Sequence, residues 1–461
     1  MRHEVNEPSE GLAPPVLSDP PAVWVRYDRE VRAEGRAAVP GGIGAALCSA
    51  SRAERDAALR QAATLPRDEL ALVLPLVAVR CADWVQPVRA RARELLRDAV
   101  RGPLPTGALA ATAAVVLAVA RRREGDGAHA LLVEAFSDAR VREVLLTAPD
   151  PVTRRFAHRA ALDGGLLPAG RAARAAAVDR DRLVRGMCLA AVADVPGADP
   201  ADLAVLPASK WPETRAAAVA ALTDAEPYLA DRSGAVRAAA RDVVRASGGQ
   251  PADLCRGQCA DAARWPYAPV GLAECAERTD GDHALLGELT AHPVARVRAS
   301  AVAGLRVLDP KGWRAVLPLL DDPSAAVVRE VTRSLAEHAS RVPDDELLAR
   351  IAPERPYRQR AAALRLLSLG YGSGRLLGLM RMQEDPDPRL RARAALAASR
   401  KTYTASSSTP EAAVELLELL DRHPDVLRTW DRSFVREVLL RVLDRAKSAG
   451  DPDPAPPTLP A

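Results

Sequence analysis

The residues with the clearest chemical potential in this chain are arginines that recur at one position of a repeated phrase. Each follows the residue that opens a short apolar pattern, as in Val297-Arg298 and Leu390-Arg391. A guanidinium is planar and offers paired donors to phosphates or carboxylates. A row of them on successive helices could therefore hold a phosphate backbone or an acidic peptide. Alternatively, each could pair with an Asp or a helix C-terminus of an adjacent repeat and tie neighbours together. The arginines at this position are Arg89, Arg154, Arg185, Arg215, Arg237, Arg298, Arg360, Arg391 and Arg436.

Further arginines and three tryptophans extend this candidate surface. Arg93 and Arg97 follow Arg89 in steps of four, on one helical face, although Glu94 and Asp98 dilute the charge. The tryptophans lie three or four residues before the start of an apolar pattern, at the expected turn between helices. A ring there could be an interaction hot spot or stack on a base, or it could fill the groove between repeats. The candidate partner-binding residues are Arg89, Arg93, Arg185, Arg215, Arg237, Arg298, Arg391, Trp84, Trp211 and Trp265.

Catalytic and metal-binding patterns are not found in the sequence. Cys255 and Cys259, with Cys275 and His283 downstream, offer four soft ligands, but their spacing matches no common zinc signature. Buried core cysteines explain them as well. There is no Walker loop, no Gly-x-Gly-x-x-Gly and no Gly-x-Ser-x-Gly. We therefore expect a protein that is not an enzyme and that needs no cofactor or metal.

Composition places the chain among soluble helical proteins. Its 461 residues are 48% hydrophobic but only 3% aromatic, so the apolar mass is mostly Ala, Leu and Val. The net charge is +4, from 64 basic and 60 acidic residues, without the clear basic excess of dedicated nucleic-acid binders. Six scattered Cys form no disulfide framework, the first residues lack a signal-peptide core, and the longest apolar run, 108–120, is too short to span a bilayer. We expect a cytoplasmic protein that does not enter membranes.

The phrase itself indicates which elements position these side chains. Its opening residue falls at 153, 184 and 214 and again at 297, 327, 359 and 390, at intervals of 30 to 32 residues. A fixed period of this size predicts stacked repeats. Val297, Ala301 and Leu305 share one helical face, and the Asp or Pro region about five residues earlier is expected to cap the helix start. A preceding apolar segment completes a helical hairpin in each repeat. The step from 214 to 236 is only 22 residues, so one helix should be clipped there.

The consensus Asp-Pro-x-x-x-Val-Arg-x-x-Ala-x-x-x-Leu resembles the second helix of HEAT repeats, particularly the short bacterial form of phycobilin-lyase-type HEAT proteins. The resemblance covers roughly residues 45–445, with Thr214 and Gln359 departing from the usual aliphatic residue. It implies an all-α, right-handed α-solenoid of about a dozen stacked hairpins (a HEAT/ARM-like superhelix) whose second helices line a concave face. It also implies mainly protein–protein interaction.

The expected organisation has three parts. Residues 1–22 should be a disordered leader and 449–461 a disordered Pro-rich tail, because both are rich in Pro and poor in apolar residues. Residues 23–448 should form the solenoid, with breaks near 101–128 and 399–411, where the phrase is weak. We expect a non-enzymatic scaffold that binds a protein on its concave surface. Nucleic-acid binding, in DNA repair or along a DNA or RNA backbone, is the alternative, and the sequence leaves the oligomeric state open.

Overall fold

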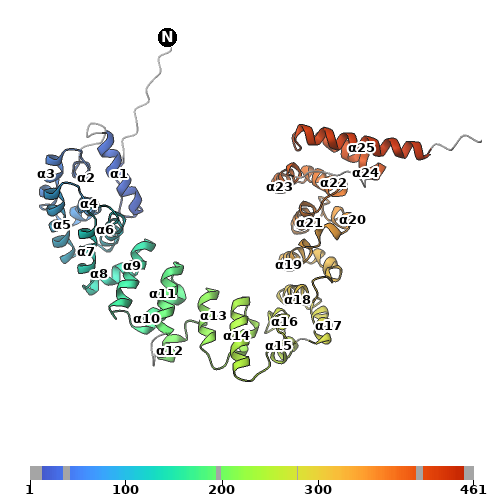
Figure 1. Ribbon diagram of the computed structural model, residues 1–461, viewed down its shortest axis with the longest axis horizontal. Coiled ribbons are helices and arrows are strands. Elements are labelled where there is room, and N and C mark those ends of the chain that lie inside the picture. The colour runs from blue at the N-terminus through green and yellow to red at the C-terminus, as the bar shows by residue number, and fades with distance from the viewer. Residues whose placement is uncertain (1–12, 35–41, 194–198, 278, 401–408, 451–461) are drawn as a thin grey trace, which may run out of the picture. The chain divides into compact units, whose positions relative to one another are not determined.

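The computed structural model describes residues 13–34, 42–193, 199–277, 279–400 and 409–450. These residues form α-helices and short 3-10 helices and contain no strand, which confirms the all-α prediction (Figure 1). The chain divides into two compact units, residues 1–218 and 219–461. The boundary falls within α13 (Pro212–Ala220).

The first unit begins with α1, whose Trp24 is buried, and continues as helices joined by short turns. Helices α3, α5 and α7 contact one another in sequence, and α4 packs against α5 and α6. Its helices are α1 (Pro21–Glu34), α2 (Ile43–Leu47), α3 (Arg52–Ala62), α4 (Arg67–Arg80), α5 (Gln86–Arg101), α6 (Thr106–Val119), α7 (Asp126–Ala135), α8 (Ala139–Leu146), α9 (Pro151–Asp163), α10 (Ala169–Val178), α11 (Arg182–Ala193) and α12 (Pro200–Leu203).

The second unit repeats the arrangement with several first helices shortened to 3-10 turns. Its phrase helices α18, α19, α21 and α23 contact one another in that order. Its helices are η2 (Glu226–Ala230), α14 (Gly234–Ala246), α15 (Pro251–Ala260), α16 (Ala268–Ala273), α17 (Asp280–Leu289), α18 (Ala295–Leu308), η3 (Trp313–Asp321), α19 (Ala325–Ala336), η4 (Ala339–Arg341), α20 (Asp344–Leu348), α21 (Tyr357–Leu369), α22 (Ser373–Arg381), η5 (Met382–Glu384), α23 (Pro388–Ser399), α24 (Pro410–Arg422) and α25 (Thr429–Gly450).

The predicted apolar stripe is what joins one helix to the next. On α18, Val297 and Ala301 are fully buried and Leu305 nearly so. Leu305 belongs to one continuous core with Val327 and Leu335 of α19, and so does its neighbour Val302. Residues at positions 0, +4 and +8 lie on one face of a helix, so each hairpin buries its stripe only when the next hairpin covers it.

Three of the expectations about the organisation of the chain concern residues that the structure describes. Residues 101–128, expected to contain a break, include α6, which is buried over most of its length. Its phrase is weak because it is apolar all round and carries no Arg, not because the chain is irregular. Between the end of α13 at Ala220 and the start of α14 at Gly234 there is only the 3-10 helix η2, as the predicted clipped helix requires. In 399–411, α23 ends at Ser399 and α24 begins at Pro410.

The expected disordered ends fall mostly outside the described residues. These include 1–12 of the leader and 451–461 of the tail, as well as 401–408 of the second expected break. Helix α1 starts at Pro21, inside the segment expected to be the leader, and α25 continues to Gly450, inside the expected tail. None of the described helices is both long and apolar enough to cross a bilayer.

Candidate interaction surfaces

The recurring arginine first binds the loop that precedes its own helix. Arg298 Nη1 donates to the His292 carbonyl at 2.9 Å, and Arg391 Nη1 donates to the Asp385 carbonyl at 2.7 Å. In each case the acceptor lies six residues earlier, where the preceding element has ended and its carbonyl has no partner within a helix. The same six-residue contact is made by Arg55, Arg89, Arg142, Arg154, Arg185, Arg215 and Arg237.

The remaining guanidinium nitrogens bind a carboxylate that comes later in the chain. Arg298 Nε and Nη2 donate to the two oxygens of Asp322, at 2.8 and 2.9 Å. Arg360 binds Asp385 in the same bidentate way, at 2.8 and 3.3 Å. Both carboxylates lie five residues before the opening residue of the next repeat. Each of these arginines therefore connects two repeats, and we call the set the arginine ladder. Its other ion pairs are Arg55–Asp83, Arg89–Glu124, Arg154–Asp179, Arg185–Glu213 and Arg237–Glu274.

The acidic residues before each apolar pattern divide two roles between them. Asp385 Oδ1 accepts a hydrogen bond from the Asp387 amide at 2.8 Å, which closes the turn, and both Asp385 oxygens accept from Arg360. The N-cap of α23 is Asp387, two residues later. Ser324 caps α19 in the same manner, and Asp322 accepts from its amide. The prediction that the Asp or Pro region about five residues before the opening position caps the helix is confirmed on α23, where Asp387 is the N-cap and Pro388 the first helical residue. Within that region, Asp385 itself shapes the turn and binds the preceding Arg.

Two of these contacts favour the charged form of a ladder residue. The hydrogen bond that Arg298 donates to Asp322 raises the pKa of Arg298 above its ordinary value. The bond from Arg185 lowers the pKa of Glu213. Arg185, Arg215 and Arg237 are also buried. Such groups have little surface left for a partner.

Two of the predicted binding residues, Arg93 and Arg391, do not make both contacts of the arginine ladder. Arg93 donates to two carbonyls, from Nε to Cys81 at 3.0 Å and from Nη2 to Glu124 at 2.7 Å. Arg391 binds the carbonyls of Asp385 and Pro386 and forms no ion pair with a carboxylate among the described residues. Arg391 is thus the predicted ladder arginine most available to a ligand.

The three predicted tryptophans are covered by arginines to different degrees. The guanidinium of Arg185 lies 3.9 Å from the ring centroid of Trp211, and that of Arg264 lies 5.0 Å from Trp265. Both rings are half-buried. Trp84 is 61% exposed although Arg32 and Arg55 also lie against its ring. Of the ten predicted residues, Trp84 alone presents a large exposed apolar surface.

A buried ion network in the first unit was not predicted. Arg55 and Asp83 are fully buried and paired at 3.0 Å, and Asp83 also accepts from Arg80 Nη1 at 2.9 Å. Arg80 in turn binds Asp28 of α1. Arg55 escaped detection because Glu54 stands where the phrase has an aliphatic residue. Arg55 could have been recognised from its distance along the chain, because it follows Ser49 by six residues and binds the Ser49 carbonyl as the other ladder arginines bind theirs.

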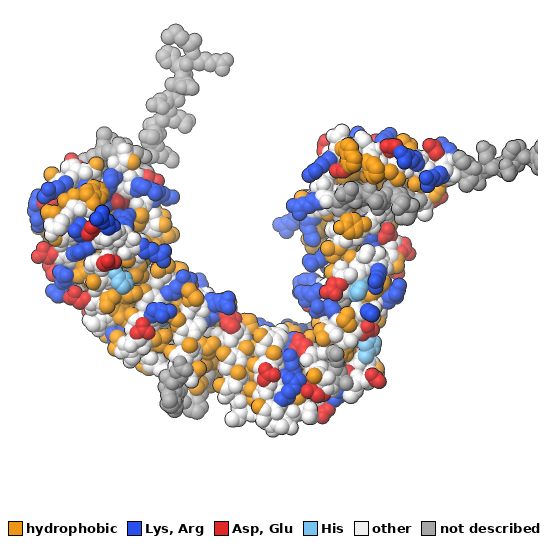
Figure 2. Space-filling view, viewed as in Figure 1, with side chains coloured by type: hydrophobic (Ala, Val, Ile, Leu, Met, Phe, Trp, Pro, Cys, Tyr) orange, Lys and Arg blue, Asp and Glu red, His pale blue; other side chains and the backbone are white. Residues whose placement is uncertain are grey.

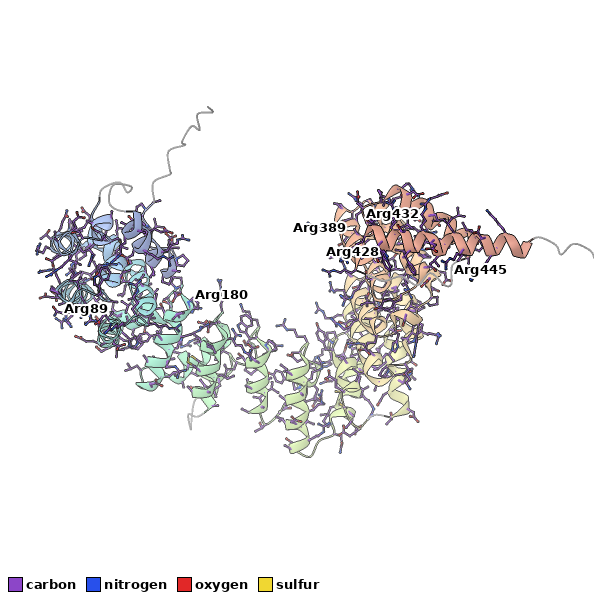
Figure 3. The ribbon with its side chains drawn as sticks, turned by 45° about the horizontal axis from the view of Figure 1, so that its top comes forward. Arg89, Arg180, Arg389, Arg428, Arg432 and Arg445 are labelled. Carbon is purple, nitrogen blue, oxygen red and sulfur yellow. The ribbon has the colours of Figure 1, made fainter. Side chains whose placement is uncertain are left out.

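Helix α25 carries the second feature that the sequence analysis missed. Trp430 is 71% exposed and Phe434 40%, and their rings stack with centroids 5.8 Å apart. In the sequence, Arg428 comes two residues before Trp430 and Arg432 comes between Trp430 and Phe434, and neither arginine pairs with a carboxylate among the described residues. We call Arg428, Trp430, Arg432 and Phe434 the α25 patch. Figure 2 shows hydrophobic side chains on this helix beside blue basic ones, and Figure 3 places Arg389 of α23 at the same end of the unit as Arg428 and Arg432.

The cysteines lie in the core. Cys255, Cys259 and Cys275 are buried and free, and Cys275 Sγ donates to the Gly271 carbonyl. Burial raises the pKa of the Cys259 thiol to about 12. Within the described part of the chain, no three potential ligands come together to hold a metal.

No family model matches the chain, and no curated protein does. Solved structures of the karyopherin Kap121p show a limited likeness. Kap121p alone has 12% identity and a TM-score of 0.31, over 91% of this chain and 54% of Kap121p. Kap121p bound to Nup53p has 13% identity and a TM-score of 0.31, over 92% and 56%. Kap121p bound to RanGTP has 13% identity and a TM-score of 0.29, over 91% and 54%. This chain thus spans about half the length of these proteins.

Proposed function

We infer that this protein is a non-enzymatic scaffold that binds a protein partner. The observation that carries the proposal is the α25 patch, where two stacked aromatic rings lie exposed and two arginines are close by in the sequence. Tryptophan and arginine are the residues most enriched at the energetic centres of protein interfaces. An aromatic pair of this size exposed on a helix costs solvation free energy unless a partner covers it.

The chemistry of the patch specifies what it would bind. The rings fit an apolar side chain of a partner, and the nearby Arg428 and Arg432 fit carboxylates close to it. Helix α25 packs against α24 and leaves Trp430 and Phe434 exposed. We therefore propose a helical or extended protein segment in which one large apolar residue is flanked by Asp or Glu.

This proposal moves the binding surface away from the arginine ladder. The sequence had placed partner contacts on a concave row of ladder arginines, but most of these have their donors engaged within the repeats. The finer parts of the earlier interpretation remain proposals. These are the short phycobilin-lyase-type form of the HEAT repeats, which the recurring Asp and Arg spacing supports, and a cytoplasmic location.

The test compares wild type with Trp430→Ala and Phe434→Ala in affinity capture from the native host, followed by binding measurements with the purified partner. Leu72→Ala is the matched control, since Leu72 is a large apolar residue, 59% exposed, on α4 of the other unit. We expect each aromatic substitution to weaken binding by about 2 kcal/mol or more, and the control to change it little. If all variants retain the partner equally, the proposal that the α25 patch binds it is refuted. Steeply salt-dependent binding to DNA or RNA instead would replace the protein partner with a nucleic acid.

A further inference from the structure

A cavity in the first unit has the composition of an anion site. It has a volume of about 300 Å³ and lies where α1, the end of α4 and the connection from α6 to α7 meet. Four guanidinium groups line it, together with two carboxylates and the exposed ring of Trp84. The arginines are Arg29, Arg32, Arg80 and Arg122, and the carboxylates are Asp28 and Asp83.

The two carboxylates are already shared among arginines. Asp28 accepts from Arg32 Nη2 at 3.0 Å and also from Arg80. Asp83 accepts from Arg80 Nη1 at 2.9 Å and from Arg55, which adjoins the cavity wall. Five guanidinium groups therefore meet two carboxylates. Arg55 and Arg80 are buried with the two carboxylates, whereas Arg32 and Arg122 are half-buried and Arg29 is exposed. The excess positive charge therefore lies on the accessible side of the cavity, where an anion can reach it.

Several donors in the wall have no acceptor among the described residues. Arg80 is almost completely buried, yet its Nε is unbonded, and so is Arg32 Nη1. The guanidinium groups of Arg29 and Arg122 form no hydrogen bond or ion pair with the described part of the chain. Burial lowers the pKa of Arg122, which shares the field of Asp28, Arg80 and Arg32. The wall thus combines excess charge with unused donors.

We propose that this cavity binds the phosphate group of a small phosphate ester whose organic part rests on Trp84. A phosphate has enough oxygens to take donors from Arg122, Arg32 and Arg29 together, and its charge of up to two balances the excess. The volume fits a small molecule and not a polymer. The ring of Trp84 lines the mouth and supplies an apolar face for the ester group. The site lies in the first unit and is independent of the protein-binding proposal.

The test is calorimetric titration of the full chain with phenyl phosphate and with inorganic phosphate at constant ionic strength. The variants are Arg122→Gln and Trp84→Ala. Arg121→Gln is the control, because Arg121 is an exposed neighbour that lies outside the cavity wall. None of the three side chains takes part in the Asp28–Arg80–Asp83 network, so folding should persist, and circular dichroism checks it.

We expect one site per chain, with phenyl phosphate binding more tightly than inorganic phosphate. Arg122→Gln should weaken both ligands about tenfold or more, since it removes a charge-assisted donor. Trp84→Ala should weaken phenyl phosphate alone, and Arg121→Gln should leave both unchanged. Absence of saturable heat with either probe at millimolar concentration would overturn the proposal. Equal losses in Arg121→Gln and Arg122→Gln would overturn it as well, because they would indicate diffuse attraction without a site.

Discussion

Removing one carboxylate of the arginine ladder should open the second unit locally. The substitution Asp385→Asn keeps an oxygen for the Asp387 amide and leaves the backbone carbonyl that holds Arg391. It removes the charge that balances Arg360 and the shorter of the two hydrogen bonds, which Arg360 Nε donates to Asp385 Oδ2. The change therefore isolates the ion pair between successive repeats.

The expected magnitude follows from burial. The side chains of Arg360 and Asp385 are only 8% and 1% exposed. Leaving one member of such a pair buried and unpaired costs about 3–5 kcal/mol. The pair between Arg436 and Asp421 provides the matched control, since its side chains are 45% and 55% exposed. An exposed pair contributes about 0–1 kcal/mol, so Asp421→Asn should change little.

The assay is native-state hydrogen exchange followed by mass spectrometry. In a repeat array each hairpin depends on its nearest neighbours, so the loss should appear at amides of α21 and α23 and fade with distance along the chain. A loss of this size corresponds to roughly 100- to 4,000-fold faster exchange through local opening. A double-mutant cycle with Arg360→Met measures the coupling directly.

One result would refute the reasoning. If Asp385→Asn accelerates exchange no more than Asp421→Asn, the pair contributes nothing beyond a surface contact, and the recurring Arg cannot be explained as the connection between repeats. Uniform acceleration over the whole second unit would equally contradict the nearest-neighbour account, although it would leave the pair itself important.

Three further outcomes are expected. The hydrogen bond from Arg155 lowers the pKa of Asp181 to about 2, whereas the unfolded value is near 4. Ionised Asp181 therefore stabilises the fold above about pH 4, and this stabilisation is lost as the pH falls towards 2. Urea unfolding at several pH values should show this, and Asp181→Asn should flatten it. Trp430→Ala should shift the unfolding free energy by about 0.5 kcal/mol or less, whereas Leu335→Ala, in the core of α19, should cost about 2–5 kcal/mol in the same urea series. Asp83→Asn should destabilise the first unit by at least about 3 kcal/mol in thermal unfolding, because it leaves two buried arginines without their shared carboxylate.

The sequence predicted the helices well because their pattern is local. Positions 0, +4 and +8 lie within one helix, and burial of Val297 and Ala301 requires only that a neighbour exists. The repeated phrase did not predict α6. This helix is buried over most of its length, so it needs neither the Arg nor an amphipathic pattern. Its sequence was taken for a break because the template describes only half-exposed helices.

The ionic partners were harder to predict because they depend on how the next repeat is built. Asp322 and Asp385 sit at the expected offset, whereas Arg237 pairs with Glu274, which lies 37 residues later. There the following repeat is irregular, and a longer Glu from another turn reaches the guanidinium. The α25 patch was missed for a simpler reason. Trp430 follows the last clear repeat, so no periodic argument drew attention to it.

The most direct test of the arginine ladder is an arginine-selective ¹⁵N spectrum of the Nε–H groups, recorded with and without heparin. Arg154, Arg237, Arg298 and Arg360 each donate from Nε to a carboxylate. We predict four slowly exchanging Nε–H signals, assigned by Arg→Lys substitution, that keep their shifts when the polyanion is added. Rapid exchange of these protons, or shifts that saturate with heparin, would show that the arginines face a ligand and do not hold the repeats together.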